Sequence, residues 1–367
     1  MAGSWARTRA RERIVALGAA GLQDRDLRRQ VLSVLREVID FGAYVWLLTD
    51  PVTAVGAAPL AEVPCITELP ALIKAKYATP VNRWTALRLQ ACPAGLLTEA
   101  VDGDLARSHV WREVMGRYGI GDVASAVFAD QYGCWGFLDL WRDGTREPFN
   151  AADAEFLASL AAPLATALRQ CQARTFVEPA SPHRHDAGPV VLTLDDHLRI
   201  ISRTAASQAW LDVLLPPAPD ERAIPASVYN VAAQVLAAEQ GVDHHSAYAR
   251  THLADGFWLT LRAARLSAGD RSAAPAAGGA ALVVTIEEAS AAERLDLFSR
   301  AFAFTAREHE LLGLLASGSD TRAMARQMSL SEHTIQDHLK SIFAKTGARD
   351  RVTVLSHALG TRRGANR

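Results

Sequence analysis

Apolar residues recur at three- and four-residue steps in the first part of the chain. This spacing places one apolar stripe on a helix, formed by Leu27, Val31, Leu32, Leu35, Val38 and Ile39. Residues 43–49 then form an apolar run that stops at Asp50 and Pro51, which predicts a strand followed by a turn. Residues 123–129 and 134–141 predict two more strands, and the short polar stretch between them indicates a hairpin.

A long helix is expected after this hairpin. Asn150 is a suitable N-cap residue, and apolar side chains follow it at helical spacing: Phe156, Leu157, Leu160, Leu164 and Leu168. Helices that flank an antiparallel sheet indicate an α+β fold. We assign residues 1–175 to this first domain.

Three prolines among polar residues predict a linker at 176–189, because proline sustains neither a helix nor a central strand. The next domain, 190–290, starts with a strand, a polar turn and a second strand over 190–202. A helix that carries Ala205, Trp210 and Leu211 and another over about 225–240 come next. Three strands then close a second α+β domain.

The low-complexity stretch 267–279 is expected as a long loop between two of these closing strands, 257–266 and 280–286. Near residues 289–297 the strand pattern gives way to a helical pattern. We therefore expect an all-α third domain after this point. We place it at residues 298–362.

The local signals are strongest in this third domain. Thr305 and Glu308 form a capping box pattern, and Gly318 can end the helix behind it. Ser319 or Asp320 can cap a second, short helix. The apolar residues expected to pack behind these caps are Leu311, Leu312, Leu314, Leu315, Ala323, Met324 and Met328.

A third helix is expected from Ser331 to about Lys345, after a tight turn at 329–330, and a fourth begins near Asp350 or Arg351. The third helix has an apolar face of Ile335, Leu339 and Ile342. Its opposite face is polar and consists of Glu332, His333, Gln336, Asp337 and Lys340. Two short helices joined by a tight turn predict a helix-turn-helix motif at about 321–340, which can place one helix in the major groove of DNA.

Charge supports this interpretation of the last domain. The whole chain of 367 residues has a formal net charge of −1 and 49% hydrophobic residues. From Phe298 onward, 11 lysines and arginines face six acidic residues, so the last 70 residues carry +5 and the preceding part −6. A basic module on an acidic body favours a polyanionic partner for the C-terminal segment.

Several other classes of protein are disfavoured. Cys65, Cys92, Cys134 and Cys171 are widely spaced, which indicates reduced thiols rather than disulfides or a zinc site. No phosphate-binding loop pattern occurs, and adjacent His244 and His245 make a poor metal site. We expect no enzyme activity, no cofactor and no metal. We also expect no secretory signal and no membrane span, and hence a cytoplasmic protein.

The first two domains resemble sensor domains in their order of elements. Residues 25–172 resemble a GAF domain: helix, strand, turn, intervening helices, hairpin and long exit helix. Chromophore-carrying GAF domains attach a bilin through a cysteine that is usually followed by histidine, and no cysteine here has that neighbour, which disfavours a bilin. Residues 190–290 resemble a PAS domain. These resemblances imply that a small-molecule effector is possible.

The third domain resembles the LuxR-type helix-turn-helix. The pattern is matched at Thr305, Arg307, Glu308, Glu310, Leu312, Leu315, Gly318, Ala325, Ser331, Thr334, Ile335, His338, Ile342, Lys345, Gly347 and Arg351. The resemblance implies a sequence-specific transcription factor of bacterial type. It would bind double-stranded DNA as a homodimer, with RNA polymerase as a possible partner.

The resemblance also assigns site residues. Gln336, Asp337 and Lys340 are candidates for base or groove contacts, and four others are candidates for phosphate contacts: Ser331, Thr334, Lys345 and Arg351. Gln336 stands where the family usually has lysine, and glutamine can pair with adenine. Asp337 would be repelled by phosphates unless it accepts from a cytosine amino group.

Two alternatives stay open. The pair Gln336-Asp337 favours a sensing or protein-interaction scaffold whose helix-turn-helix has lost specific DNA binding. An enzyme that uses a pocket of the GAF-like domain rests on the resemblance alone. Four tryptophans could line such a pocket, or form the core of that domain: Trp84, Trp111, Trp135 and Trp141.

Overall fold

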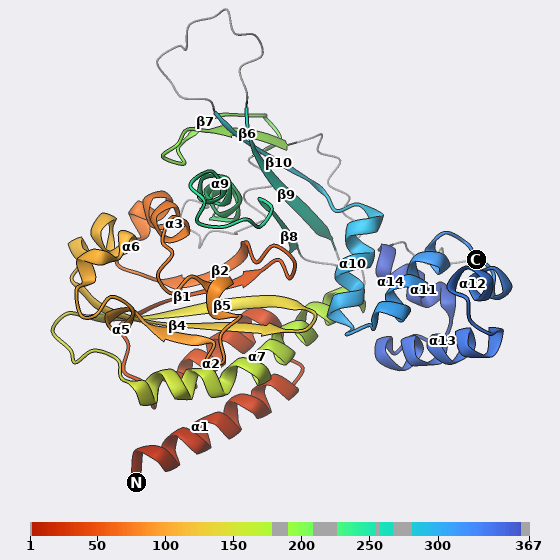
Figure 1. Cartoon of the computed structure of the whole chain (residues 1–367), viewed down its shortest axis with the longest axis horizontal. Helices are drawn as coiled ribbons and strands as arrows, with labels where there is room; N and C mark the ends of the chain where they lie inside the picture. The colour runs from red at the N-terminus through yellow and green to blue at the C-terminus, as the bar shows by residue number, and fades with distance from the viewer. Residues whose placement is uncertain (1, 178–189, 208–225, 254–256, 267–280, 361–367) are drawn as a thin grey trace, which may run out of the picture. The chain divides into compact units, whose positions relative to one another are not determined.

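The chain folds into two compact units (Figure 1). The computed structural model describes residues 2–177, 190–207, 226–253, 257–266 and 281–360. The first unit comprises residues 1–168, 186–251 and 260–287, and the second comprises 169–185, 252–259 and 288–367. Most of both α+β segments expected from the sequence therefore belongs to the first unit, and the helix-turn-helix segment belongs to the second.

The first unit contains an antiparallel sheet of order β2-β1-β5-β4-β3. Its strands are β1 (Ala43–Thr49), β2 (Gly56–Glu62), β3 (Ala94–Leu96), β4 (Ile120–Asp130) and β5 (Gly133–Asp143). The strand expected at 43–49 and the hairpin expected from residues 123–141 are confirmed. Strands β2 and β3 were not predicted, since β2 is rich in alanine and contains Pro59, and β3 is very short.

Helices cover both faces of this sheet. On one side lie α1 (Ala2–Ala19), α2 (Asp24–Arg36) and α7 (Ala151–Val177) (Figure 1). The stripe predicted for α2 is buried at Leu27, Val31, Leu32 and Leu35. The other face packs against α3 (Leu69–Tyr77), α4 (Trp84–Leu87), α5 (Leu97–Ala100) and α6 (His109–Glu113). There Trp84 stacks on Phe137, with ring centroids 4.6 Å apart, so this tryptophan belongs to the core.

Helix α7 is the long helix expected after the hairpin. Asn150 caps it, because its Oδ1 accepts from the backbone N–H of Asp153 at 3.2 Å, and the five predicted apolar residues are all buried. By length and composition α7 could span a membrane, although no such span was expected from the sequence. Half of its most apolar window is buried within the fold, so its length and composition are weak evidence for a membrane span. The helix continues through Val177, two residues into the expected linker, whose remaining residues lie outside the described chain.

The second sheet also lies in the first unit and has the order β7-β6-β10-β9-β8. Its strands are β6 (Val190–Leu194), β7 (Ile200–Arg203), β8 (Tyr248–His252), β9 (Trp258–Arg265) and β10 (Leu282–Glu288), and α9 (Ala226–Glu239) is the expected helix at 225–240. The helix expected around Trp210 and the loop expected at 267–279 lie outside the described residues. In both sheets the strands follow the order second, first, fifth, fourth, third, although the sequence shows no internal repeat.

Helix α9 joins the two α+β segments by covering the edge of the first sheet. Ser227 donates its hydroxyl to the carbonyl oxygen of Ala57, and Asn230 Nδ2 donates to that of Gly56 at 3.1 Å. Both acceptors belong to β2, whose outer edge would otherwise expose unpaired backbone groups. The second segment therefore completes the first sheet rather than standing apart from it.

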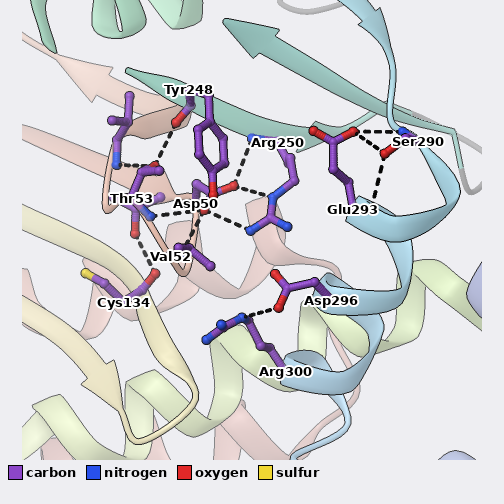
Figure 2. A network of polar contacts seen from close by, with 12 residues as sticks. Asp50, Val52, Thr53, Cys134, Tyr248, Arg250, Ser290, Glu293, Asp296 and Arg300 are labelled. Carbon is purple, nitrogen blue, oxygen red and sulfur yellow. Dashed lines mark hydrogen bonds and ion pairs between the residues drawn. The ribbon is translucent and has the colours of Figure 1, made fainter. Parts of the chain in front are cut away.

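Two buried ion pairs strengthen this connection. Arg250 on β8 contacts both carboxylate oxygens of Asp50, at 2.6 and 3.0 Å, and both side chains are almost fully buried (Figure 2). Arg83 Nε lies 2.7 Å from Asp243 Oδ2, and both of these side chains are also buried. Thr53 adds a hydrogen bond of 2.7 Å to the carbonyl oxygen of Tyr248 (Figure 2). Buried ion pairs of this kind tolerate little displacement, since separation would leave a charge without a partner.

The second unit is a helical domain with one hydrophobic core. Its helices are α10 (Ala291–Ala301), α11 (Ala306–Ala316), α12 (Thr321–Met328), α13 (Glu332–Thr346) and α14 (Arg351–Leu359). The core also includes Phe176 from the end of α7 and Trp258 from the start of β9, whose rings stack at 5.2 Å. Phe176 packs edge-on against Phe298 of α10 at 5.4 Å.

The expected start of this domain at Phe298 falls inside α10. Ser290 and Glu293 form a capping box at the beginning of that helix (Figure 2). Arg294 donates to the carbonyl oxygen of Ala358 at 3.2 Å, which ties α10 to α14. Helix α10 is thus an integral part of the helical domain.

A fragment of residues 290–360 should therefore be more stable than one of residues 298–367. The longer α10 restores its cap and the fully buried Leu297, and together these contribute about 2–4 kcal/mol. Urea denaturation followed by circular dichroism measures the difference. Equal midpoints for the two fragments would show that the first half of α10 is dispensable.

Candidate nucleic-acid interface

The candidate interface is built on α11, which fixes the position of α13. Thr305 caps α11 through the backbone N–H of Glu308 at 3.2 Å, and Glu308 accepts in return from the N–H of Thr305 at 2.7 Å. The expected capping box is therefore confirmed. Gly318 lies just beyond the helix with φ +81°, as expected for a helix stop.

Glu308 has a second role that the capping pattern does not reveal. Its carboxylate is buried and also accepts from Ser341 Oγ and Lys345 Nζ, each at 2.6 Å. Burial by itself would raise the pKa of Glu308, but the hydrogen bonds from Lys345, Ser341 and Thr305 outweigh it, and the pKa lies below its usual value. One carboxylate thus joins the start of α11 to the second half of α13.

The turn between α12 and α13 has the geometry of a helix-turn-helix. Asp320, one of the two expected caps, accepts from the N–H of Ala323 at 2.7 Å. Ser329 ends α12 in the left-handed region, with φ 54°, and Leu330 donates its N–H to the carbonyl oxygen of Ala325 at 2.9 Å. These bonds hold the tight turn that the sequence predicts.

Helix α13 has the two faces that were predicted. Ile335, Leu339 and Ile342 are buried in the core. Five residues on the other face are exposed: Glu332, His333, Gln336, Asp337 and Lys340. Because the apolar face is fixed by packing, the polar face is presented to solvent as one continuous surface. We call this surface the α13 face.

Charges on the α13 face are paired with each other. Lys340 Nζ lies 3.0 Å from Asp337 Oδ1, and His333 Nε2 lies 3.6 Å from Asp337 Oδ2. The hydrogen bond from Lys340 holds the pKa of Asp337 below its usual value. Gln336, in contrast, makes no hydrogen bond within the described part of the chain. Its side-chain amide is therefore open to solvent.

The four residues expected at phosphates are all used within the domain itself. Ser331 caps α13 by accepting from the N–H of Thr334 at 3.1 Å, and the two hydroxyls lie 2.9 Å apart. Lys345 is bound to Glu308, as above, and to the carbonyl oxygen of Ala303 at 3.0 Å. Arg351 donates to Thr321 Oγ1 at 2.7 Å. Ser331 and Thr334 thus form the cap of α13, whereas Lys345 and Arg351 link their helices to other parts of the domain.

Three basic residues were missed by sequence reasoning. Arg322 and Arg326 are exposed on α12, and Arg349 is exposed just before α14. None has a hydrogen bond or ion pair with another described residue. The signal was available for α12, because burial of Met324, Ala325 and Met328 directs positions 322 and 326 outward.

The described residues hold no group of three metal-ligating side chains, and their four cysteines are free thiols. The chemistry of the second unit is therefore that of an exposed polar helix on a packed core. In a helix-turn-helix, the second helix enters the major groove while the first crosses the phosphate backbone. Here α13 and α12 occupy those two positions.

Comparison with known proteins agrees with this geometry. Residues 303–358 match the family described as bacterial regulatory proteins, luxR family. The C-terminal domain is therefore a luxR-type helix-turn-helix domain. The match does not extend to the two α+β segments of the first unit.

A curated relative matches over a short stretch of the chain. The monoamine regulon transcriptional regulator of Klebsiella aerogenes is 38% identical over 52 residues, which are 14% of this chain and 23% of that protein. The chain thus spans less than a quarter of that regulator's length. A crystal structure of Escherichia coli SdiA aligns over 97% of both chains, with 13% identity and a TM-score of 0.34, which does not establish a common fold.

Proposed function

We propose that the chain is a cytoplasmic, sequence-specific transcriptional regulator that binds DNA through the α13 face. The observation that carries this proposal is the exposed polar helix on a luxR-type core, with free basic residues on the neighbouring α12. The protein is not proposed to be an enzyme. Recovery of bound fragments from genomic DNA, followed by sequencing, tests DNA binding and yields the operator in the same experiment.

The proposal also assigns a role to each of these residues. Gln336 and Lys340 read base edges, with Asp337 accepting from a cytosine amino group. Arg322, Arg326 and Arg349 bind phosphates, because they are exposed and have no partner among the described residues. Ser331 and Thr334, at the start of α13, contact the phosphate backbone of the DNA. For Lys345 and Arg351, phosphate contact would compete with their present bonds, and we assign them mainly to positioning α13 and α14.

Lys340→Ala and Gln336→Ala should have different effects on DNA binding. If Lys340 reads a guanine, its loss should cost about 1–3 kcal/mol on the operator and remove the preference at one base pair. Loss of Gln336 should weaken the preference for one base pair over the others. It should not change the salt dependence of the affinity, because an uncharged glutamine releases no counterions from DNA. Fluorescence anisotropy at several salt concentrations, on operator and random DNA, measures both effects.

Arg262→Ala is the matched control, since Arg262 is an exposed arginine on β9 that belongs to the first unit and not to the helix-turn-helix domain. It should leave the affinity for the operator unchanged. Wild-type binding by both α13 variants would show that α13 is not the reading helix. It would favour the alternative, a scaffold whose helix-turn-helix no longer binds specific DNA, for which the Asp337–Lys340 pair is the supporting observation.

A homodimer is proposed through α14. Val354 is fully buried in the domain core, so it is not available for a dimer seam, and Val354→Asp would unfold the domain. Val352 is 60% exposed on the same helix and is the better candidate for the seam.

Val352→Asp should therefore weaken self-association by about tenfold or more, because a charge in an apolar seam has no partner. Sedimentation equilibrium measures the change, and circular dichroism checks that the fold is kept. Val352→Thr, with a similar shape, should have a smaller effect. A wild-type association constant for Val352→Asp would leave α14 as a core helix alone.

The first unit is proposed to sense a signal through its GAF-like and PAS-like segments. What supports this is the order of elements in each segment together with two five-stranded sheets of the same strand order. The effector and contacts with RNA polymerase are part of this proposal. Because the two segments share buried ion pairs, we expect them to respond as one body.

A further inference from the structure

Helix α1 carries a large aromatic side chain on its outer surface. The helix packs against the rest of the first unit through Ala10 and Ile14, which are buried, and through Gly18, where a Cβ would lie 3.0 Å from that of Ala167 on α7. Trp5 does not take part in this packing, since it is 65% exposed. Tryptophan is enriched at protein interfaces, where its ring fills a pocket of the partner.

A groove lies near the other end of α1, between this helix and α2. Its volume is about 470 Å³. The wall on α1 contains Ala16, Leu17 and Ala20, with Arg13 one turn earlier, and Val34 of α2 adds apolar surface to the opposite wall. Because the two alanines are small and exposed, the groove is open to solvent and has room for a large side chain.

Trp5 and the groove lie on the same face of α1. Trp5, Arg9, Glu12 and Ala16 follow one another at steps of four, three and four residues, the spacing that keeps side chains on one face of a helix. All four are exposed, and the guanidinium carbon of Arg9 lies 5.4 Å from the centroid of the Trp5 ring. The face therefore has an aromatic ring near its start, two opposite charges in its middle and a groove near its end.

This face of α1 is complementary to itself. Two copies of the helix can pair in opposite directions about a two-fold axis that passes between positions 10 and 11. Trp5 of each copy then lies opposite Ala16 of the other copy, and Arg9 of each lies opposite Glu12 of the other, because both pairs of positions have the same mid-point. Glu12 makes no hydrogen bond or ion pair with another described residue, so its carboxylate is available for this contact.

We infer that this face of α1 is a self-association surface and that its occupant is a second copy of this chain. Trp5 of each copy fills the groove of the other beside Arg13, whose guanidinium can lie over the indole ring. Arg9 and Glu12 set the antiparallel direction. A parallel pair would place each of these two residues opposite itself and bring like charges together.

This inference rests on the proposal that the chain is a homodimeric regulator, and it adds a contact in the first unit to the seam proposed on α14. Sedimentation equilibrium of the full-length chain separates the two contacts, because it can be carried out with Val352→Asp present or absent. In both proteins Trp5→Ala should weaken self-association at least about tenfold, the effect expected for a central aromatic residue of an interface. Circular dichroism should stay unchanged, since Trp5 is exposed.

Leu89→Ala is the matched control for Trp5→Ala. Leu89 is 79% exposed and belongs to the first unit, but it does not lie on α1. Its replacement removes a comparable exposed apolar side chain and should leave self-association unchanged. A loss as large as that of Trp5→Ala would mean that association of the chains is unspecific and would overturn the inference.

Charge reversal tests the antiparallel pairing itself. Arg9→Glu alone, or Glu12→Arg alone, brings like charges together at both symmetric positions and should weaken self-association about tenfold. An equimolar mixture of the two variants forms unlike pairs at both positions, so mixed dimers should recover to within about threefold of the parent protein. Fluorescence-detected sedimentation with one variant labelled measures the mixed species. A structural defect within one chain would not be relieved by mixing.

Two further outcomes would overturn the inference: unchanged self-association in Trp5→Ala, or no recovery when the charge-reversed variants are mixed. The occupant of the groove would then not be a second copy of this chain. If Val352→Asp alone abolishes self-association, α14 is the whole seam and the contact through α1 is rejected. Affinity for operator DNA, measured on the same samples, shows separately whether the regulator proposal stands.

Discussion

Replacing Arg250 with methionine should lower the free energy of unfolding of the first unit by about 3–5 kcal/mol. The substitution leaves the carboxylate of Asp50, which is 0% exposed, without its ionic partner. The N–H groups of Val52 and Thr53 and the backbone N–H at position 250 still bind that carboxylate, but they do not compensate its charge. Urea denaturation followed by tryptophan fluorescence measures the loss.

Arg199→Met is the matched control for this experiment. Arg199 also pairs with an aspartate, Asp195 at 2.7 Å, but its side chain is 75% exposed, so its loss should cost less than about 1 kcal/mol. The double substitution Asp50→Asn with Arg250→Met should regain part of the stability, because no buried charge is left. Equal costs for Arg250→Met and Arg199→Met would show that the pair does not join the two segments.

The same contacts predict the behaviour of the second α+β segment, residues 190–290, when it is produced alone. Residues 190–290 would lose the partners of Ser227, Asn230 and Arg250, all of which are in the first α+β segment. These three side chains are buried in the full chain, and in the isolated segment they would lack their hydrogen-bond and ionic partners, which destabilises it. Although the sequence presents two domains in succession, the physical unit of folding contains both.

The elements that sequence reasoning identified are those specified by local signals. Each of these signals depends on residues a few positions apart. They are the polar turn of the β4–β5 hairpin, the apolar stripe of α13 and the helix caps Asn150, Thr305, Asp320 and Ser331. The strongest of these signals lie in the helix-turn-helix, so its geometry could be predicted almost completely. Family resemblance added the function, which the geometry of caps alone does not indicate.

What could not be predicted depends on distant residues. Strand β2 has a weak strand composition and is held by pairing with β1 on one side and by α9 on the other. Lys345 has the charge of a phosphate ligand, but its partner Glu308 is 37 residues away along the chain. The shared strand order of the two sheets could not be predicted either. Strand order depends on which backbones pair, and the two segments show no repeated sequence that would indicate it.

Replacing Glu308 with alanine should destabilise the helical domain by about 3–5 kcal/mol and remove most of its acid sensitivity. The buried carboxylate joins Thr305, Ser341 and Lys345. Its loss leaves the N–H of Thr305 and the hydroxyl of Ser341 without this acceptor and removes the ionic partner of Lys345. Because α13 would then be held less firmly, operator affinity should fall as well. Urea midpoints of the fragment 290–360 measure the stability.

The pH dependence follows from the direction of the pKa shift. The pKa of Glu308 is lower in the folded domain than in the unfolded chain, where a glutamate titrates near about 4.3. The carboxylate therefore contributes its full stabilisation above about pH 4.3, and this contribution is lost as the pH falls through the folded pKa. Glu308→Gln should flatten the decline in stability below that pH.

Glu310→Gln is the control for this last experiment, since Glu310 is an exposed glutamate on the same helix, paired with Arg307 at 2.8 Å. Its replacement should change stability by less than about 1 kcal/mol and leave the acid decline in place. If Glu308→Gln unfolds with the same pH profile as the wild type, the carboxylate is not the group whose protonation loosens α13. The positioning of the α13 face would then depend on the apolar contacts of Ile335, Leu339 and Ile342 alone.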